Sequence, residues 1–310
     1  MISKLRSEGK KVAAAAPTGI AALLLNAGTT LHKMFRLPVP LVENSTSTIT
    51  TTSKKADDLR EIDVFMFDEG SSISKYSVQA VNLLLQDVMN NNIEFGNKII
   101  VTGDFRQTLP VVPRSGPAQI IEACLKSSPL WNFFKKHKLT KNMRAAPEEH
   151  AFADWLLTIG DGTATVKSNE PFKGCVKIPQ EIIVPQNSSL IDAMYDVNAA
   201  ASDFQSRAIL TPNNKDSIDI NEQILLRVPG EVKTYYSADD IITDDEIDRD
   251  AYPLEFINSQ TPSGCPTHKL NLKVDAVVML LRNLDLERGL CNGTRLIVTR
   301  LFQNCVEARS

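Results

Sequence analysis

Acidic and amide side chains follow two short apolar stretches of this 310-residue sequence. The stretch VFMFDEGSS runs directly into Asp68 and Glu69, and the stretch IIVTGDFRQTLPVV reaches Asp104 and Gln107 around one glycine. In nucleotide hydrolases, one carboxylate holds Mg²⁺ on the phosphates, a second polarises the attacking water, and an amide contacts the terminal phosphate. The two stretches therefore predict one side of a nucleotide hydrolysis site, with Asp68 as the metal ligand.

An arginine is the further group that such a site uses. A guanidinium directed at the terminal phosphate accelerates the reaction by about 10³–10⁵, and Arg144 in LTKNMRA is the candidate. Each candidate also has an ordinary interpretation: an apolar run ending in Asp-Glu arises by chance, a loop glutamine bonds to backbone, and an arginine caps a helix. A metal-dependent nuclease built on Asp68, Glu69 and Asp104 is a third hypothesis, but no further acidic or histidine cluster completes a two-metal site.

Short apolar strands alternate with amphipathic helices in the first half of the chain. The sequence predicts strands over residues 12–16, 63–67 and 98–102. Helices are predicted over residues 19–26 and where Tyr76, Ala80, Leu83, Leu84 and Val88 recur at helical spacing. This alternation is typical of an α/β fold with a parallel sheet covered on both faces. Because ligands bind beyond the carboxyl ends of such strands, we expect Asp68 and Asp104 at the same edge.

A change in composition after residue 160 predicts the joint between two domains. Glycines and prolines recur there, and we place the domains at residues 1–165 and 166–310. The second domain is predicted to open with a strand over residues 207–210 and a helix over residues 219–226. It is predicted to end in β-strands that are joined by a turn containing glycine.

Charge and cysteine content restrict the partners and the compartment. The formal net charge is −3, so the protein as a whole does not attract nucleic acid, and any nucleic acid must bind in a local basic groove. Five cysteines without a CxxC indicate reduced thiols, so we do not expect a secreted protein. Pro17 and Gly19 split the apolar N-terminal part into runs too short for a membrane span or a secretory signal. We therefore expect no membrane partner.

Taken together, the motifs resemble those of the Pif-type DNA helicases of superfamily one, especially the helicases of Helitron transposons. The matching blocks are APTGIAALLLNAGTTLHKMF, DVFMFDEGSSIS, GDFRQTLPVV, LTKNMRA, ILTPNNKDSIDINEQIL and HKLNLKVDAVVMLLRNLDLERGLCNGTRL. They follow the order and rough spacing of the family over most of the chain. The resemblance implies two RecA-like domains with parallel sheets, which move single-stranded DNA with 5′→3′ polarity and use ATP with Mg²⁺.

The resemblance also implies roles for individual residues on the nucleotide side. Asp68 and Glu69 correspond to the magnesium-binding and the water-activating acids. Gln107 corresponds to the sensor of the γ-phosphate, and Arg144 corresponds to an arginine finger. Asp104 is expected to lie with them at the bound nucleotide.

A second set of residues matches the contacts that the family makes with DNA. The set comprises Thr18, Gly19, His32 and Phe35 in the first domain, and Pro212, Asn213 and His268 in the second. Phe35 has two interpretations, because its ring either stacks on a base or belongs to the core. The expected partners are single-stranded DNA and duplex junctions. The expected setting is nuclear, in DNA repair, recombination, telomere maintenance or transposition, or cytoplasmic for a decayed transposon product.

The sequence departs from the family pattern in two places. Gly70 stands where the family has a bulky apolar residue, and we expect it to loosen the turn after the acid pair. No G-x-x-x-x-G-K-[ST] phosphate loop occurs in the sequence, so ATP is expected to lack its anchor. By resemblance, the first domain is expected to lack its phosphate-loop strand, and the second to end before its final motifs. The alternative to an active helicase is an inactive remnant that binds single-stranded DNA or a partner.

Overall fold

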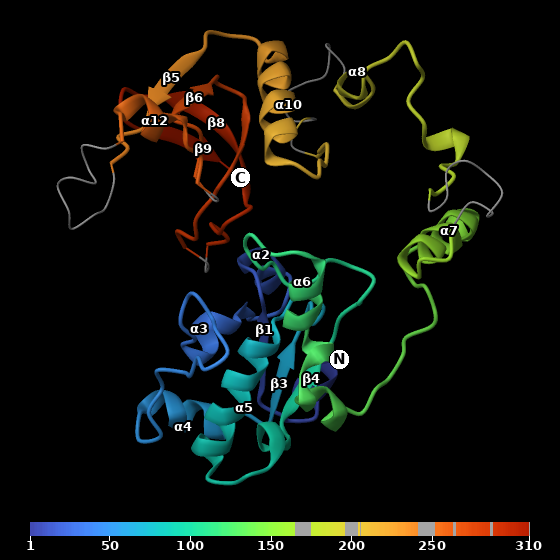
Figure 1. Ribbon diagram of the computed structural model, residues 1–310, viewed down its shortest axis with the longest axis vertical. Coiled ribbons are helices and arrows are strands. Elements are labelled where there is room, and N and C mark those ends of the chain that lie inside the picture. Colours follow the sequence, from blue (N-terminus) through green and yellow to red (C-terminus); the bar gives the residue numbers. More distant parts are fainter. Residues whose placement is uncertain are drawn as a thin grey trace. The chain divides into compact units, whose positions relative to one another are not determined.

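The chain forms two compact units in the computed structural model, residues 1–178 and 179–310 (Figure 1). Each unit has its own sheet structure and its own core. The structure describes residues 1–164, 175–195, 204, 206–240, 252–262, 265–285 and 288–309. The domain boundary predicted between residues 165 and 166 lies outside the described residues.

Four short parallel strands form the sheet of the first unit. They are β1 (Val12–Ala16), β2 (Thr29–Thr30), β3 (Val64–Phe67) and β4 (Ile99–Val101), in the order β2-β1-β3-β4. Ala15 pairs with Thr29 on one side and with Phe67 on the other, and Phe67 pairs with Val101. The parallel sheet and the three strands predicted from apolar runs are confirmed. Strand β2 was not predicted, because two threonines are too few to give a periodic pattern.

Helices connect these strands and cover the sheet (Figure 1). They are α1 (Ile2–Ser7), α2 (Gly19–Leu23), α3 (Leu31–Phe35), α4 (Lys54–Glu61), α5 (Lys75–Met89), α6 (Pro117–Ala123) and α7 (His150–Gly160), with 3₁₀ helices η1 (Glu94–Asn97), η2 (Leu125–Ser127), η3 (Pro129–Phe133) and η4 (Pro147–Glu149). The predicted helix around α5 is confirmed: Ser74 caps its first turn, and Asn90 ends it in the left-handed conformation. Helix α2 ends before residue 26, because the chain must turn back there to add β2 to the sheet.

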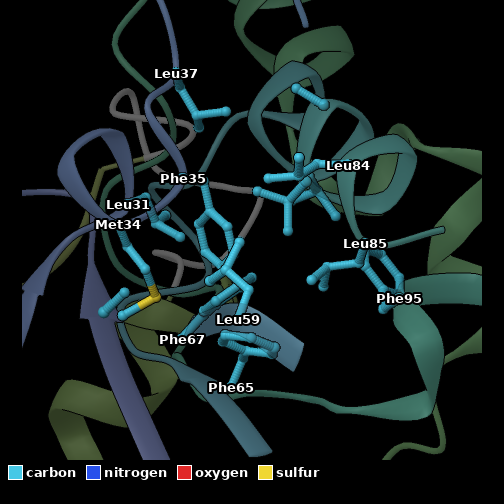
Figure 2. Close-up of a cluster of buried hydrophobic side chains, with 14 of the residues drawn as sticks. Leu31, Met34, Phe35, Leu37, Leu59, Phe65, Phe67, Leu84, Leu85 and Phe95 are labelled. Atoms are coloured by element: carbon cyan, nitrogen blue, oxygen red, sulfur yellow. The ribbon is translucent and has the colours of Figure 1, made fainter. Parts of the chain in front are cut away.

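The core of the first unit lies between the sheet and the helices α3, α4 and α5. Figure 2 shows the side chain of Phe35 among those of Phe65, Phe67 and Leu59. The ring centroid of Phe35 lies 5.5 Å from that of Phe65 and 5.7 Å from that of Phe67, edge to face in the second pair. Aromatic rings prefer such tilted arrangements, which add to the stabilisation from area burial.

The buried position of Phe35 decides between its two predicted roles. None of its surface is exposed (0%), and both neighbouring rings belong to strand β3. A ring in this position has no free face on which a base can stack. The structure therefore corrects the stacking role and supports the core role.

The described residues of the second unit form two antiparallel sheets and a smaller core. Its helices are η5 (Gln180–Ile182), α8 (Leu190–Met194), α10 (Asn214–Arg227) and α12 (Leu254–Ser259), and its strands are β5 (Lys233–Tyr236), β6 (Lys269–Leu272), β7 (Val277–Met279), β8 (Arg295–Leu301) and β9 (Val306–Arg309). Strand β5 pairs with β6, while β7, β8 and β9 form the other sheet. Tyr195 and Phe204 meet edge to face in the core. Among the described helices of the whole chain, none is long and apolar enough to cross a membrane.

The second unit differs from the parallel sheet predicted for it. Every strand pairing in its described residues is antiparallel, and residues 207–210 form no strand there, so that predicted strand is wrong. The guanidinium of Arg295 donates to the carbonyl oxygens of Phe204 (2.9 Å) and Arg207 (2.6 Å). The Arg295 side chain therefore takes the carbonyl oxygen at the start of residues 207–210. In a sheet, a backbone amide of a neighbouring strand would donate to that oxygen. The predicted helix, which lies within α10, and the β-strands predicted at the end are confirmed.

Replacing Phe35 with alanine is expected to lower the free energy of unfolding of the first unit by about 3–5 kcal/mol, because a cavity would form against Phe65 and Phe67. Urea denaturation followed by circular dichroism measures this change. The control is Phe133→Ala, whose side chain is 62% exposed and whose removal should cost less than about 1 kcal/mol. Equal losses in the two variants would contradict the core role of Phe35.

Candidate functional site

The carboxyl ends of the four parallel strands carry most of the residues predicted for the site in the first unit. Thr18 follows β1, His32 follows β2, Asp68 follows β3 and Asp104 follows β4. Because all four strands run in the same direction, these turns lie along one edge of the sheet. The expectation that Asp68 and Asp104 share this edge is confirmed. The residues predicted to contact DNA follow β1 and β2, whereas Asp68 and Asp104 follow β3 and β4.

Asp68 is held at the end of β3 by contacts with both neighbouring strands. Its backbone amide donates to the carbonyl oxygen of Ala15 (2.9 Å), and its Oδ1 accepts a hydrogen bond from the hydroxyl of Thr102 (2.7 Å). Thr102 is itself fixed, because its amide donates to the carbonyl oxygen of Phe67 (2.7 Å). The protein thus orients the half-buried carboxylate through one oxygen. The sequence gives no stronger sign of this role for Thr102 than its position at the end of an apolar run.

The backbone after β3 is tightly packed. Glu69 has φ = 54°, a left-handed value that costs such a residue about 1–3 kcal/mol and is found at functional sites. Gly70 is buried, its amide donates to the carbonyl oxygen of Thr102 (2.8 Å), and a Cβ added there would lie 2.5 Å from Cγ1 of Val101. A Cβ added to Gly103 would lie 2.6 Å from the amide nitrogen of Gly70. The turns that carry the acids therefore touch backbone to backbone, and the loosening expected from Gly70 is wrong.

The turn after β4 uses Asp104 to fix its own shape. Oδ1 of Asp104 accepts a hydrogen bond from the backbone amide of Arg106 (3.0 Å) and lies 3.6 Å from Nη1 of the same arginine. The amide of Gln107 donates to the carbonyl oxygen of Asp104 (3.0 Å), which closes the turn. The Gln107 side chain is exposed. Asp104 therefore supports the turn on which Gln107 stands.

Arg106, which no predicted role covers, ties this turn to the end of α7. Its Nε and Nη2 donate to the two carboxylate oxygens of Asp161, at 2.6 Å and 3.3 Å. The hydrogen bonds of this pair lower the pKa of Asp161 and raise the pKa of Arg106. The partners are 55 positions apart in the chain, so no local pattern reveals the pair. The one available signal is a cation inside the motif that carries Asp104 and Gln107.

Arg144 lies in an exposed segment without regular structure. Oδ1 of Asn142 accepts from the amides of Arg144 (2.9 Å) and Ala145 (3.2 Å), which turns the chain at this point. Within the described residues, the guanidinium of Arg144 makes no hydrogen bond or ion pair with Asp68 or Glu69. The role of Arg144 as an arginine finger stays a prediction.

Thr18, Gly19 and His32 lie at the turns after β1 and β2. Thr18 is exposed, and its hydroxyl oxygen accepts from the amide of Ala21 (3.3 Å), which caps α2 where the helix begins at the buried Gly19. His32 is half-buried, and this burial lowers its pKa, which favours the neutral form of its ring. The next residue, Lys33, is exposed and positively charged. An exposed hydroxyl, an imidazole and a cation therefore come together in two adjacent turns.

Pro212 and Asn213 lie at the beginning of α10 in the second unit, and both are exposed. The side-chain amide of Asn213 donates to a carboxylate oxygen of Asp216 (3.0 Å), and the backbone carbonyl oxygen of Asn213 accepts from the hydroxyl of Thr211 (2.9 Å). These bonds fix the turn before the helix while both predicted residues face solvent. Their contact with DNA stays a prediction.

His268 meets two polar partners through a single ring nitrogen. Its Nδ1 lies 2.8 Å from Oγ of Ser237 and 3.1 Å from Oδ2 of Asp239. The hydrogen bond from Ser237, followed by that from His268, lowers the pKa of Asp239. Because both partners share Nδ1, the arrangement lacks the relay of a Ser-His-Asp triad, in which the serine and the acid use different nitrogens. The two hydrogen bonds of His268 thus involve Nδ1 and not Nε2.

The described part of the chain contains no group of three or more His, Cys, Asp or Glu side chains arranged to hold a metal ion. The three-acid nuclease hypothesis therefore gains no support. A magnesium ion bound with a nucleotide needs only one or two carboxylates, since phosphates and water complete its coordination. Asp68 fits that requirement, because Thr102 fixes one of its carboxylate oxygens.

Comparison with known proteins gives a consistent result over both units. A family model described as PIF1-like helicase matches residues 1–170, and a model described as DNA helicase Pif1, 2B domain, matches residues 255–301. The ATP-dependent DNA helicase PIF1 of Candida albicans is 28% identical over 309 residues, which cover 95% of this chain and 30% of the relative. The ATP-dependent DNA helicase Pif1 of Psychrobacter sp. is 27% identical over 296 residues, which cover 94% of this chain and 40% of the relative.

Solved structures agree with these matches at the level of the fold. The crystal structure of Bacteroides Pif1 bound to ssDNA superposes with a TM-score of 0.61 and 23% identity, covering 99% of this chain and 64% of that protein. At this identity the likeness supports the mixed α/β, RecA-like fold alone. The chain spans 30% to 40% of the length of the two curated relatives.

Gly103→Ala is expected to destabilise the first unit by about 1–3 kcal/mol, because its Cβ would lie 2.6 Å from the backbone nitrogen of Gly70. The control is Gly116→Ala, whose Cβ would meet nothing within 4 Å and whose cost as a helix cap is under about 1 kcal/mol. Chemical denaturation of both variants measures the difference. Equal unfolding free energies would contradict the close contact between the two turns.

Proposed function

The chain belongs to the PIF1-like helicase family, and from this membership we propose that it carries part of an ATP-dependent DNA helicase. One observation carries the proposal: the turns after β1, β2, β3 and β4 lie along a single edge of a parallel sheet. A nucleotide and a DNA strand that meet this edge are adjacent.

On the nucleotide side, we propose that Asp68 holds Mg²⁺ and that Glu69 orients the attacking water. Support comes from the fixed orientation of the Asp68 carboxylate and from the left-handed backbone at Glu69. Gln107 senses the γ-phosphate from a turn that Asp104 supports, and Arg144 acts as the arginine finger. Bound Mg²⁺ supplies charge stabilisation on the phosphates, while these side chains position the groups around it.

On the DNA side, we propose that Thr18, Gly19 and His32 contact the backbone of a single strand. The exposed hydroxyl of Thr18 and the ring of His32 offer hydrogen bonds, and the neighbouring Lys33 provides a positive charge. Pro212, Asn213 and His268 contribute from the second unit. This arrangement recognises phosphate and sugar rather than base edges, so binding is independent of sequence.

The finer features of the activity follow the motif resemblance. We propose 5′→3′ movement to a duplex junction, Mg²⁺ dependence, and a nuclear role in DNA repair, recombination, telomere maintenance or transposition. Duplexes with a 5′ or a 3′ single-stranded tail test the polarity in a longer chain that also carries a phosphate loop. Unwinding of the 3′-tailed duplex alone would overturn it.

The absence of G-x-x-x-x-G-K-[ST] from the 310 residues favours a second candidate function. In this candidate, the chain by itself binds single-stranded DNA and hydrolyses no ATP. Backbone amides and a lysine around the β- and γ-phosphates normally anchor ATP, and no such loop is encoded in these residues.

We expect the 310-residue chain by itself to release phosphate from ATP at a negligible rate, with or without single-stranded DNA, because it has no phosphate loop. A phosphate-release assay measures this rate in the parent and in Glu69→Gln. DNA-stimulated turnover that disappears in the variant would contradict the expectation, and it would assign the hydrolysis to this site.

The chain is expected to bind single-stranded DNA weakly, without sequence preference and more weakly as salt rises. His32→Ala should weaken binding about threefold to tenfold, since one hydrogen bond contributes roughly 1 kcal/mol. Fluorescence anisotropy with labelled oligonucleotides of different sequence measures both effects. The control is His150→Ala, an exposed histidine of α7. Absence of binding by the parent at low salt would overturn the DNA part of the proposed function.

A further inference from the structure

The first unit has a cavity of about 530 Å³, and none of the residues proposed for the nucleotide side lines it. Residues of α3, α4, β1 and β2 contribute to its lining, together with the residue that ends each helix. Three of the lining side chains are cations, Lys33, Arg36 and Lys55, and Asp58 is the one acid among them. The volume falls within the range of small-ligand sites, about 300–1,000 Å³.

In the part of the chain that the structure describes, the three cations of the cavity are paired with no acid. In the described residues, no hydrogen bond or ion pair involves the side chain of Lys33, Arg36 or Lys55. Some other cations of this unit are paired, as Lys11 is with Glu61 (2.7 Å), although several exposed lysines are not. Like charges around one cavity repel each other, and a single acid does not neutralise them. An anion in the cavity would remove this repulsion.

Two further features belong to residues that line the cavity. Thr29 is one of these residues, and its Oγ1 is buried without a hydrogen-bond partner among the described residues. Buried hydroxyls nearly always bond, so this group lacks an acceptor for its proton. Arg36 has φ = 45°, the left-handed position after α3 where glycine or asparagine is usual. The chain therefore holds a long cationic side chain at a backbone position that disfavours it.

We propose that this cavity binds a phosphate group, with Lys33, Arg36 and Lys55 providing charge and Thr29 providing a hydroxyl donor. A phosphodiester of single-stranded DNA and free phosphate offer the same oxygens. Of the two sources, we propose the DNA backbone. Helix α3 carries both His32, which is proposed to contact DNA, and Lys33, which lines the cavity, so one strand can reach both. At about 1.5 Å per residue, Arg36 lies roughly 6 Å beyond His32 along the helix. The choice of DNA as the source rests on the proposed function, whereas the phosphate site itself does not.

The test compares two adjacent lysines of α4 in the 310-residue chain. Lys55→Gln removes a cation of the cavity, and the control Lys54→Gln removes an exposed cation outside it, with the same change in net charge. Fluorescence anisotropy with labelled oligothymidine is measured over a range of salt concentrations. Thermal stabilisation by inorganic phosphate is measured against chloride at equal ionic strength. Lys55→Arg keeps the positive charge, so it should keep the DNA binding or the stabilisation by phosphate that Lys55→Gln loses.

If the DNA backbone is the ligand, Lys55→Gln should weaken oligothymidine binding about threefold to tenfold and reduce the salt slope by about 0.7, while Lys54→Gln changes neither. If free phosphate is the ligand, inorganic phosphate should stabilise the parent and Lys54→Gln but not Lys55→Gln, with DNA binding unchanged. Equal effects of the two variants in both measurements would overturn the phosphate site. A parent that binds no DNA overturns the proposed function, and the phosphate measurement still decides the cavity.

Discussion

The parallel pairing of β1, β3 and β4 is the constraint on which the rest of the first unit depends. Ala15, Phe67 and Val101 lie at one level of the sheet, so the chain leaves all three strands at nearly the same height. Parallel strands need crossover connections, and each crossover returns the chain to the opposite edge before the next strand begins. Turns with polar side chains therefore gather at one edge, although about 35 residues separate Asp68 from Asp104 in the sequence.

Close backbone contact joins the two turns of this shared edge that carry the acids. Gly70 and Gly103 leave no room for a Cβ between the two acid-bearing turns, and Thr102 bonds to the carboxylate that ends the neighbouring strand. Arg106 extends the connection to α7 through Asp161. Each of these links fixes a backbone or a side chain next to a predicted site residue. None of the linking residues belongs to the chemistry itself, which is why residue type alone did not identify them.

The parts of the fold that follow from local pattern could be predicted from the sequence, and those that depend on distant partners could not. Apolar runs of four or five residues gave β1 and β3, and helical spacing gave α5, because burial imposes those periods directly. The Arg106–Asp161 pair joins residues 55 positions apart, and no spacing encodes it. Residues 207–210 have a strand-like composition, but a strand also needs a neighbour, and Arg295 bonds at the start of that segment instead.

Helix α3 explains why the ring of Phe35, predicted either to stack on a base or to belong to the core, belongs to the core. Leu31, Met34 and Phe35 recur at the i, i+3, i+4 spacing of a buried face, and all three are less than 10% exposed. His32, Lys33 and Arg36 occupy the intervening positions, and none of the three is buried. The aromatic ring belongs to the buried set, so it fixes the helix to β3. The polar set is what the helix offers to a ligand, and its charges extend from the sheet edge into the cation-lined cavity. A phosphate chain that follows α3 would thus meet hydrogen bonds first and positive charge next, on a helix held in place by Phe35.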